Sequence, residues 1–289
     1  MSGISTSIDY TLLYSSAPSG NIAASMLATL YSGATAAGTG TATSTGNPIL
    51  DLKLAQQNET KDVAQEAKDP TVVRDLAAFT KAIANAPNIK TALQNPNVLK
   101  VLLTANGLGD QVQYTALAGK ALMSDPSDPN SLANQLSDTR WKTIAQTYDF
   151  AKNGLAELQN PATQAQIAQS YERVSWLNSL DQATPGLSEA LEFKQQASRI
   201  TSVDAILGDP INRDVVLTAL GIPEQIAFQD LPAQEQAVSS RLDVTKLQDP
   251  NFVNTLTDRY LLTKQQSASA SSSSTGITSL AAQISGIVV

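Results

Sequence analysis

Two stretches of this sequence follow one pattern: NPNVLKVLLTANGLGDQ at 95–111 and DPINRDVVLTALGIPEQ at 209–225. Each begins with an Asx-Pro pair, and an Asx side chain caps the free amides of a helix while Pro at the first helical position removes no donor that the helix needs. Each continues with an apolar run that ends at a glycine, Gly107 or Gly221, the residue best suited to the left-handed position after a helix. The stretches therefore predict two capped helices of the same kind, 114 residues apart.

The same offset relates further residues. It pairs Phe79 with Phe193 and Leu93 with Leu207, and after three residues are dropped from the second copy it pairs Trp141 with Phe252. We therefore expect two copies of one helical unit, at about 70–152 and 184–264, joined by a helix over about 160–182. Because two copies are too few for a solenoid, the pattern favours a duplicated helical core over residues 70–264.

Helix signals dominate the sequence between its two ends. Apolar residues recur at three- and four-residue spacing over 138–156 and 161–182, and no run shows two-residue alternation, so we expect an all-α fold without strands. Residues 51–69 form a largely polar helix, which suits an exposed connector or a helix that waits for a partner. We favour the connector. Asx-Pro pairs predict five helix starts, at Asp69-Pro70, Asn95-Pro96, Asn160-Pro161, Asp209-Pro210 and Asp249-Pro250.

The two ends of the chain are almost free of charge. Asp9 is the only charged residue before Asp51, and none follows Lys264. Tracts rich in Ser, Thr, Ala and Gly at 34–47 and 265–276 predict flexible linkers, each followed or preceded by a short apolar segment that suits a small amphipathic helix, at 19–33 and 276–289. We therefore expect an uncharged, mostly flexible N-terminal segment over 1–50 and a flexible Ser-rich tail with a short terminal helix over 265–289.

The composition excludes several classes of function. The 289 residues contain no cysteine and no histidine, which removes disulfides, thiolate nucleophiles, imidazole bases and almost all zinc sites. A net charge of −7 disfavours nucleic-acid binding, because that affinity comes from clustered Lys and Arg. No apolar run approaches the roughly 20 residues of a membrane span, and no Lys or Arg precedes an apolar stretch at the N-terminus, so we expect neither a membrane helix nor a Sec-type signal peptide.

The remaining candidate sites have simpler explanations. Asn106–Asp110 is rich in glycine but lacks the Lys-Ser/Thr end of a phosphate loop, and Pro223 replaces Gly109 in the second copy, so we interpret it as a helix terminator. The carboxylate pairs Asp209 with Asp214 and Asp125 with Asp128 suit helix caps better than Mg²⁺ or Ca²⁺, since no Asp-x-Asp-x-Asp loop exists.

Neither serine nor aromatic residues predict a site. The sequence has no Ser-x-x-Lys spacing and no Gly-x-Ser-x-Gly elbow. The aromatic residues at core spacing are more simply buried anchors than a ligand surface. We therefore predict no catalytic, cofactor-binding or metal-binding residues and no cofactor. The aromatic anchors are Trp141, Tyr148, Phe150, Tyr171, Trp176 and Phe193.

Six longer motifs carry a resemblance. VLKVLLTANGLGDQ (98–111), YTALAGKAL (114–122), RWKTIAQTYDFA (140–151), SVDAILGDP (202–210), DVVLTALGIPEQIAFQ (214–229) and RLDVTKLQDPNFV (241–253) resemble a family of alphaproteobacterial proteins that carry a domain of unknown function, some of them encoded among flagellar genes. The resemblance covers about 47–264. It implies an array of helices and an association with the flagellum, but no active site.

Three functions follow as hypotheses. The first is an exported, non-enzymatic structural or assembly protein of the flagellum, whose uncharged ends pass through an export channel and pair as helices on assembly. The second is a cytoplasmic adaptor or chaperone-like module that holds a partner helix in a groove of the duplicated core. The third, an enzyme that uses carboxylates or Lys, requires a deep pocket of convergent charged residues. The first two imply protein partners, without nucleic acid.

Overall fold

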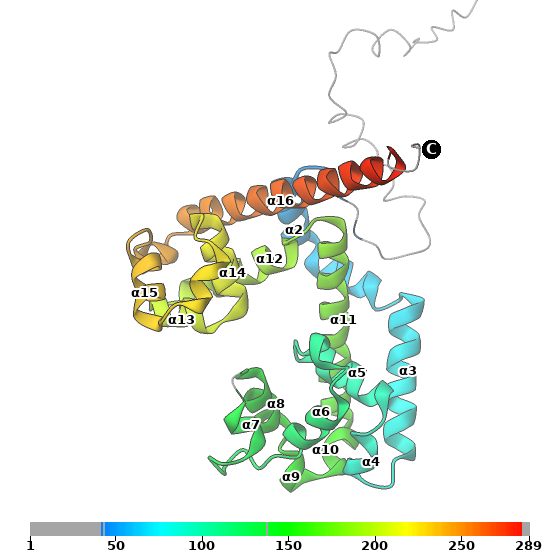
Figure 1. Ribbon diagram of the computed structural model, residues 1–289. Helices are drawn as coiled ribbons and strands as arrows, with labels where there is room; N and C mark the ends of the chain where they lie inside the picture. The colour runs from blue at the N-terminus through cyan, green and yellow to red at the C-terminus, as the bar shows by residue number, and fades with distance from the viewer. Residues whose placement is uncertain (1–41, 43, 137, 285–289) are drawn as a thin grey trace, which may run out of the picture. The chain divides into compact units, whose positions relative to one another are not determined.

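We describe the protein from a computed structural model, which covers residue 42, residues 44–136 and residues 138–284, with side chains up to residue 270 (Figure 1). These residues form helices and connecting turns, with no strand among them, so the predicted all-α class is confirmed. The predicted helix at 19–33 lies outside the described residues. In chain order, with η for 3-10 helices, the elements are α2 Pro48–Glu66, α3 Pro70–Asn85, α4 Ile89–Ala92, α5 Pro96–Ala105, η2 Gly109–Gln111, α6 Thr115–Leu122, α7 Leu132–Gln135, α8 Arg140–Tyr148, α9 Phe150–Asn153, α10 Leu155–Gln159, α11 Pro161–Ala183, α12 Leu187–Gln196, η3 Ala197–Arg199, α13 Val203–Gly208, α14 Pro210–Leu220, η4 Glu224–Phe228, α15 Leu231–Ser239, η5 Val244–Gln248 and α16 Pro250–Ile284.

The Asx-Pro rule is confirmed at all five predicted helix starts. α3, α5, α11, α14 and α16 each begin at the proline, and the preceding Asx side chain accepts a hydrogen bond from a backbone amide of the first turn, at 2.7–2.9 Å. A sixth pair, Asn47-Pro48, starts α2 in the same way, with the Asn47 side chain accepting from the amides of Ile49 and Leu50. The pair stands at the end of the Gly- and Thr-rich tract predicted as a linker over 34–47, so this helix start was not predicted.

Apolar side chains gather in two separate clusters. The N-terminal core draws on α3, α5, α6, α8 and the first half of α11, with Phe79 and Trp141 among its largest buried members. The C-terminal core draws on α12, α14, α16 and the second half of α11, with Trp176, Phe193 and Tyr260 among its largest buried members. α11 therefore contributes to both cores, because its apolar residues pass from one cluster to the other along a single helix.

The repeated stretches have matching local structure. Gly107 after α5 and Gly221 after α14 both have left-handed φ angles, of 73° and 64°. In both, the next amide donates back to the carbonyl five residues earlier, from Leu108 to Leu103 at 2.8 Å and from Ile222 to Leu217 at 2.9 Å. These hydrogen bonds close the end of each helix in the same way. The internal duplication stays a prediction, because these are local likenesses.

Helix α2 differs from the exposed connector that we favoured over 51–69. It begins at Pro48 and packs against α11, α12 and α16. Leu52 and Ala55, spaced one helical turn apart, enter the C-terminal core, and Val63 packs against its edge. Leu52, Ala55 and Val63 are enough for this contact, since the three lie on one face of the helix. The connector interpretation was wrong.

Helix α16 overturns the predicted flexible linker over 265–276. The helix runs from Pro250 through this tract to Ile284, and residues 285–289 lie outside the described part of the chain (Figure 1). No proline interrupts the tract, and the Ser267 and Ser269 hydroxyls donate to the carbonyls of Thr263 and Gln265, four residues earlier, at 3.0 and 2.9 Å. Local side-chain bonds of this kind keep serine compatible with a helix.

The stretch at 138–156, which has apolar residues at helical spacing, forms three short helices, α8, α9 and α10. Asp149 adopts a left-handed conformation with φ 42° and ends α8, and its amide donates to the Ala145 carbonyl at 2.9 Å. Gly154, with φ 61°, separates α9 from α10. The reversal stacks the rings of Tyr148 and Phe150, with centroids 5.3 Å apart. The apolar spacing correctly indicated which residues are buried, but it did not predict the helix ends at Asp149 and Gly154.

Candidate functional site

The two predicted carboxylate pairs do not form a catalytic or metal centre. Asp209 caps α14, while Asp214 accepts hydrogen bonds from Tyr260 and Lys264, each at 2.9 Å. Asp125 and Asp128 each accept a backbone amide two residues ahead, which forms tight turns. Within the described residues, no three acidic side chains gather where they could hold a metal ion.

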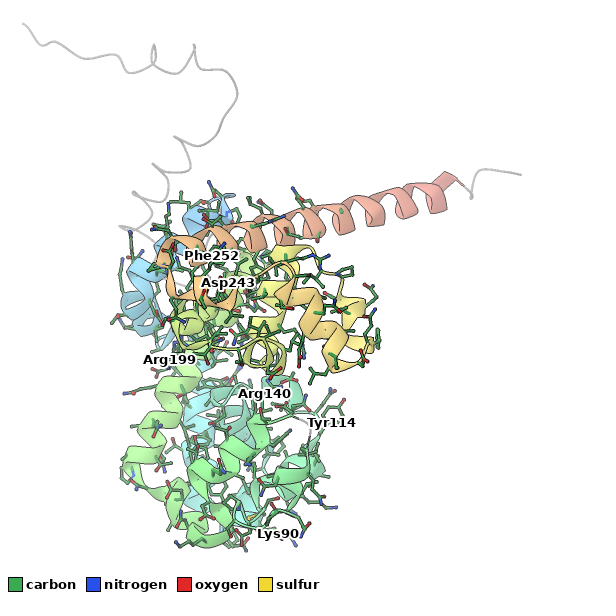
Figure 2. The ribbon with its side chains drawn as sticks, turned by 90° about the vertical axis from the view of Figure 1, so that its left-hand side faces the viewer. Lys90, Tyr114, Arg140, Arg199, Asp243 and Phe252 are labelled. Carbon is green, nitrogen blue, oxygen red and sulfur yellow. The ribbon has the colours of Figure 1, made fainter. Side chains whose placement is uncertain are left out.

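The glycine-rich segment at 106–110 contacts the side chain of Arg140. Arg140 lies at the start of α8 (Figure 2). Its guanidinium donates to the Gly107 carbonyl and forms ion pairs with Asp138 at 2.7 Å and Asp110 at 3.6 Å. The hydrogen bond from Arg140 lowers the pKa of Asp138. A phosphate would meet the Asp110 carboxylate here, so the helix-terminator interpretation fits this geometry better than an anion site.

The aromatic anchors are buried, as predicted. Their exposed fractions are 5% or less, and they belong to the N-terminal or the C-terminal core. None of them is free to form a ligand surface. The residues are Trp141, Tyr148, Phe150, Tyr171, Trp176 and Phe193.

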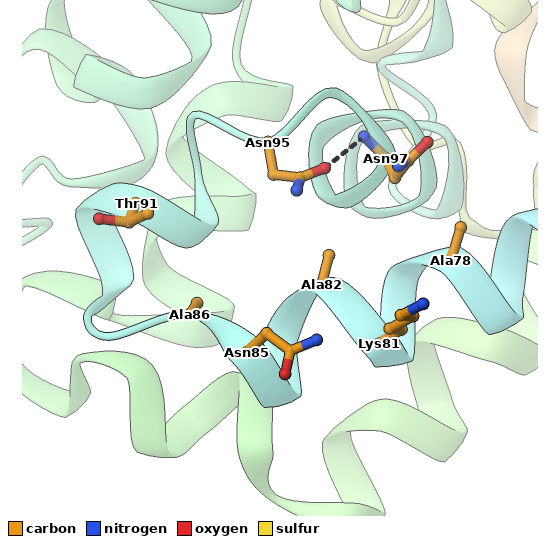
Figure 3. A pocket seen from close by; sticks show the side chains of 8 residues that line it. All are labelled: Ala78, Lys81, Ala82, Asn85, Ala86, Thr91, Asn95 and Asn97. Carbon is orange, nitrogen blue, oxygen red and sulfur yellow. Dashed lines mark hydrogen bonds between the residues drawn. The ribbon is translucent and has the colours of Figure 1, made fainter.

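The larger groove lies between the second half of α3 and the start of α5, with a volume of about 350 Å³ (Figure 3). Alanines of α3 line one wall, with Lys81 and Asn85 beside them, and Thr91, Asn95 and Asn97 form the opposite wall. The Asn95 side chain is already occupied by the amide of Asn97 at 2.9 Å. Lys81 is the only charged residue of the lining, so the groove lacks an acid-base pair.

A second groove, of about 300 Å³, lies between α12 and the start of α14. Each residue of its lining stands 114 positions after a residue that lines the first groove. The chemistry differs, because Glu192, Arg199 and Asp209 replace neutral residues. Glu192 is paired with Arg173 at 3.2 Å and Asp209 caps α14, so both carboxylates of the lining are engaged in contacts that hold the fold. The full lining is Glu192, Gln195, Gln196, Arg199, Asp209 and Ile211.

Neither groove was predicted from the sequence. Their lining residues are mostly alanine and amides, which carry no motif of their own. Only the 114-residue offset, applied position by position to the face of α3, relates the two linings.

An acidic cluster of Asp181, Glu189 and Asp214 lies where the α11–α12 turn meets α16. Burial raises the pKa of Asp181, and burial together with the Asp181 charge raises the pKa of Glu189. Burial and the three nearby carboxylates also raise the pKa of Tyr260, which donates to Asp214 at 2.9 Å. Lys264 supplies the nearby positive charge, with its Nζ 2.9 Å from Asp214.

The turn beside this cluster is closely packed. Gly186 has φ 84°, and a Cβ at this position would lie 3.0 Å from the Tyr260 ring. Asp181 accepts hydrogen bonds from the amide and hydroxyl of Ser188, which caps the first turn of α12. The cluster therefore fixes the turn between α11 and α12 against the base of α16.

In the first half of the chain, the positions that match Glu189 and Asp214 carry one acid and one base. Asp75 and Lys100 stand 114 positions before Glu189 and Asp214, and they form a direct ion pair. Burial raises the pKa of Asp75, but hydrogen bonds from Lys100 and Tyr171 outweigh that effect and hold it below its ordinary value. At the positions 114 residues later the chain has two acids, Glu189 and Asp214, so the charges there are less well balanced.

Glu189→Gln should therefore stabilise the protein. A raised pKa in the folded state means that folding binds a proton, so wild-type stability falls as the pH rises from 4.5 through the folded pKa. We expect the variant to be more stable at pH 7 by on the order of 1 kcal/mol. Urea denaturation from pH 4.5 to 8 measures this, with the exposed Glu224→Gln as control. A variant that is no more stable than wild type at pH 7 would contradict the raised pKa of Glu189.

None of the helices in the described part of the chain is long and apolar enough to cross a membrane. No curated protein matches the sequence. The crystal structure of protein AGR_C_984 from Agrobacterium tumefaciens is similar, with a TM-score of 0.59 and 26% identity, over 74% of this chain and 91% of that one. A family model described as a protein of unknown function, DUF1217, matches residues 105–253. These residues make up more than half of the chain, which therefore belongs to the DUF1217 family.

Proposed function

We propose that this protein is a non-enzymatic structural or assembly component of the bacterial flagellum, exported from the cell. The flagellar part rests on the resemblance to alphaproteobacterial proteins encoded among flagellar genes. The assembly part rests on the contact between the first described residues of the core and the base of its last helix. We call residues 1–41 the N-terminal arm and residues 265–289 the C-terminal arm.

The observation that carries the proposal is that the first residues of the described core lie beside the base of the C-terminal arm. The Gln265 side chain donates to the Gly46 carbonyl at 3.2 Å, which joins the first residues of the core to the base of the C-terminal arm. The Asp51 carboxylate, 6% exposed, holds the incoming chain by accepting from the Ser44 hydroxyl at 2.8 Å and from the amide and hydroxyl of Thr45 at 2.9 and 2.6 Å. Hydrogen bonds to Gln265 and to Asp51 therefore hold residues 44–46 against the core.

The C-terminal arm leaves the core as a helix. Leu261 is the last residue of α16 in the C-terminal core, and every side chain from Gln265 to Ala270 is exposed. From Gln265 to Ile284 the helix extends for roughly 30 Å at the usual rise per residue. Because most of the stability of a helix in a protein comes from packing, a helical extension of this length suits pairing with another chain.

The sequence of the arms suits such pairing. Between Tyr10 and Thr41, and again after Lys264, no residue is charged. Burying these segments against another chain therefore carries no penalty for desolvating charge. Apolar residues at helical spacing in 19–33 and 276–289 provide a face for a partner helix.

The alternative is a cytoplasmic adaptor or chaperone-like module. The two grooves favour it, because they repeat at matched positions on a core that presents no reactive groups in them. An adaptor of this kind would use its grooves and retain its function without the arms.

Cell fractionation distinguishes the two functions. The protein is followed by immunoblot in culture supernatant, sheared filaments and cytosol, from wild-type cells and cells without the flagellar export ATPase. We expect it outside the cell or with the filaments in the wild type and only in the cytosol of the mutant. Cytosolic protein in both strains would overturn the flagellar proposal and leave the adaptor.

A further inference from the structure

Phe228 stands almost completely exposed in an acidic part of the chain. It ends η4, and its side chain is 91% exposed. A single exposed apolar residue is common on protein surfaces, so exposure alone does not mark an interaction site. Residues 215–240, however, contain three acidic residues and no Lys or Arg. Of these acids, Glu224 and Asp230 are exposed, and neither forms an ion pair with any described residue. We call residues 224–230 the acidic segment.

The groove between α3 and α5 has the opposite charge. Lys81 is the only charged residue of its lining, and Lys90 directly precedes Thr91 of the opposite wall. Between Asp75 and Asp110 the sequence has three lysines and no acidic residue. Lys81 and Lys90 are exposed, and neither forms an ion pair within the described part of the chain. A protein with a net charge of −7 therefore has a groove in a basic stretch of its sequence.

The lining of this groove suits an aromatic side chain. Ala78, Ala82 and Ala86 stand four residues apart and form one wall, which is only partly buried (Figure 3). An apolar cavity of about 150 Å³ is enough to bind benzene. The groove, of about 350 Å³, therefore has room for a phenyl ring. The side chains of Asn85 and Asn97 form no hydrogen bond with other described residues, so both amides are available to the backbone of a docked segment.

The second groove is a poorer site for the acidic segment. Its lining contains two acids, Glu192 and Asp209, with Arg199 as the one base, so an acidic segment gains less there from charge. Gln196, also of this lining, donates from its amide to the Asn212 side chain at 2.9 Å. The charge and the free amides therefore favour the groove between α3 and α5.

The acidic segment does not occupy the groove of its own copy. Phe228 is 91% exposed and the groove is open, so each lacks its partner within a single chain. We propose that the acidic segment of one copy docks in the groove between α3 and α5 of a second copy. Phe228 contacts the alanine wall, which removes its ring from water, and the two exposed carboxylates approach the two exposed lysines.

This contact joins two different surfaces. It is therefore heterologous, and it generates rows or rings of copies rather than closing at a dimer. The inference deepens the proposed function, on which its biological meaning rests, because an assembly component needs contacts that can repeat.

Mixed disulfides test the docking directly, because the chain has no cysteine of its own. Purified full-length Asn85→Cys, with its thiol in the groove lining, is mixed with full-length Gln229→Cys, whose thiol follows Phe228, and the mixture is oxidised mildly. A disulfide between the two variants, identified by mass spectrometry, is necessarily between copies. We expect at least about tenfold more of it than with Arg199→Cys, the exposed matched position of the second groove, in place of Asn85→Cys.

The aromatic side chain is tested in the same assay. Phe228→Ser, added to Gln229→Cys, should lower the mixed disulfide by about tenfold or more. It should leave the thermal midpoint unchanged, since the side chain is 91% exposed. Mixed disulfide no greater than with Arg199→Cys, or insensitive to Phe228→Ser, would overturn the docking.

Charge exchange tests the electrostatic part of the contact. Lys81→Glu in the groove variant and Glu224→Lys in the acidic-segment variant should each lower the mixed disulfide several-fold, and the two together should restore it. Both residues are exposed, so neither change should disturb the fold. A loss in each single exchange without recovery in the double exchange would contradict the pairing of the acidic segment with this groove.

The outcome is independent of the cell fractionation. If the mixed disulfide fails while the protein is found with the filaments, the docking is wrong and the proposed function stands. If it forms while the protein stays in the cytosol of both strains, the copies associate through the groove and the flagellar role is wrong.

Discussion

Phe79→Ala and Phe193→Ala are each expected to lower the free energy of unfolding by about 3–5 kcal/mol. Both side chains are at most 1% exposed. Replacing either with alanine leaves a cavity that the close-packed surroundings fill only in part. Because Phe79 belongs to the N-terminal core and Phe193 to the C-terminal core, each substitution should first destabilise its own cluster.

Hydrogen exchange resolved by residue measures this difference, together with urea denaturation for the total. Phe79→Ala should lose amide protection first in α3 and α5, and Phe193→Ala first in α12 and α14. Residues of α11 should respond to both, because Tyr171 lies in one core and Trp176 in the other. The exposed Phe228→Ala is the matched control, with an effect within about 0.5 kcal/mol. Equal loss of protection throughout the chain in both variants would contradict two separate cores.

The helix starts could be predicted because their signal is local. An Asx side chain and the following proline act on the first turn of the same helix, so no distant contact is needed to choose the start. The same applies to Gly107 and Gly221, whose left-handed conformation ends a helix without reference to the rest of the fold. These residues fixed the boundaries of α5 and α14 from the sequence alone.

Packing between distant segments could not be predicted in this way. Leu52 and Ala55 are ordinary residues in a polar helix, and their burial depends on α11, α12 and α16. The course of α16 through the Ser-rich tract was missed for a related reason, since serine has only a weak preference against helix and an existing helix extends readily into it.

The candidate surfaces were only partly accessible from the sequence. The offset of 114 residues was found, but which matched positions line grooves and which stand exposed depends on the fold. Tyr114 and Phe228 match in the sequence just as Phe79 and Phe193 do, yet the first pair is exposed and the second is buried. Exposure, which separates an interaction surface from a core, is a property of the packed structure.

Deletion of residues 2–41 tests most directly whether the arms carry the function. The first described residue that packs against the C-terminal core is Ala42, so the truncated chain retains all the described contacts and should keep its thermal midpoint. We expect the truncated protein to disappear from the sheared filaments and supernatant of wild-type cells and to accumulate in the cytosol, while full-length Glu189→Gln behaves as wild type. Truncated protein found with the filaments at the wild-type level would contradict the account.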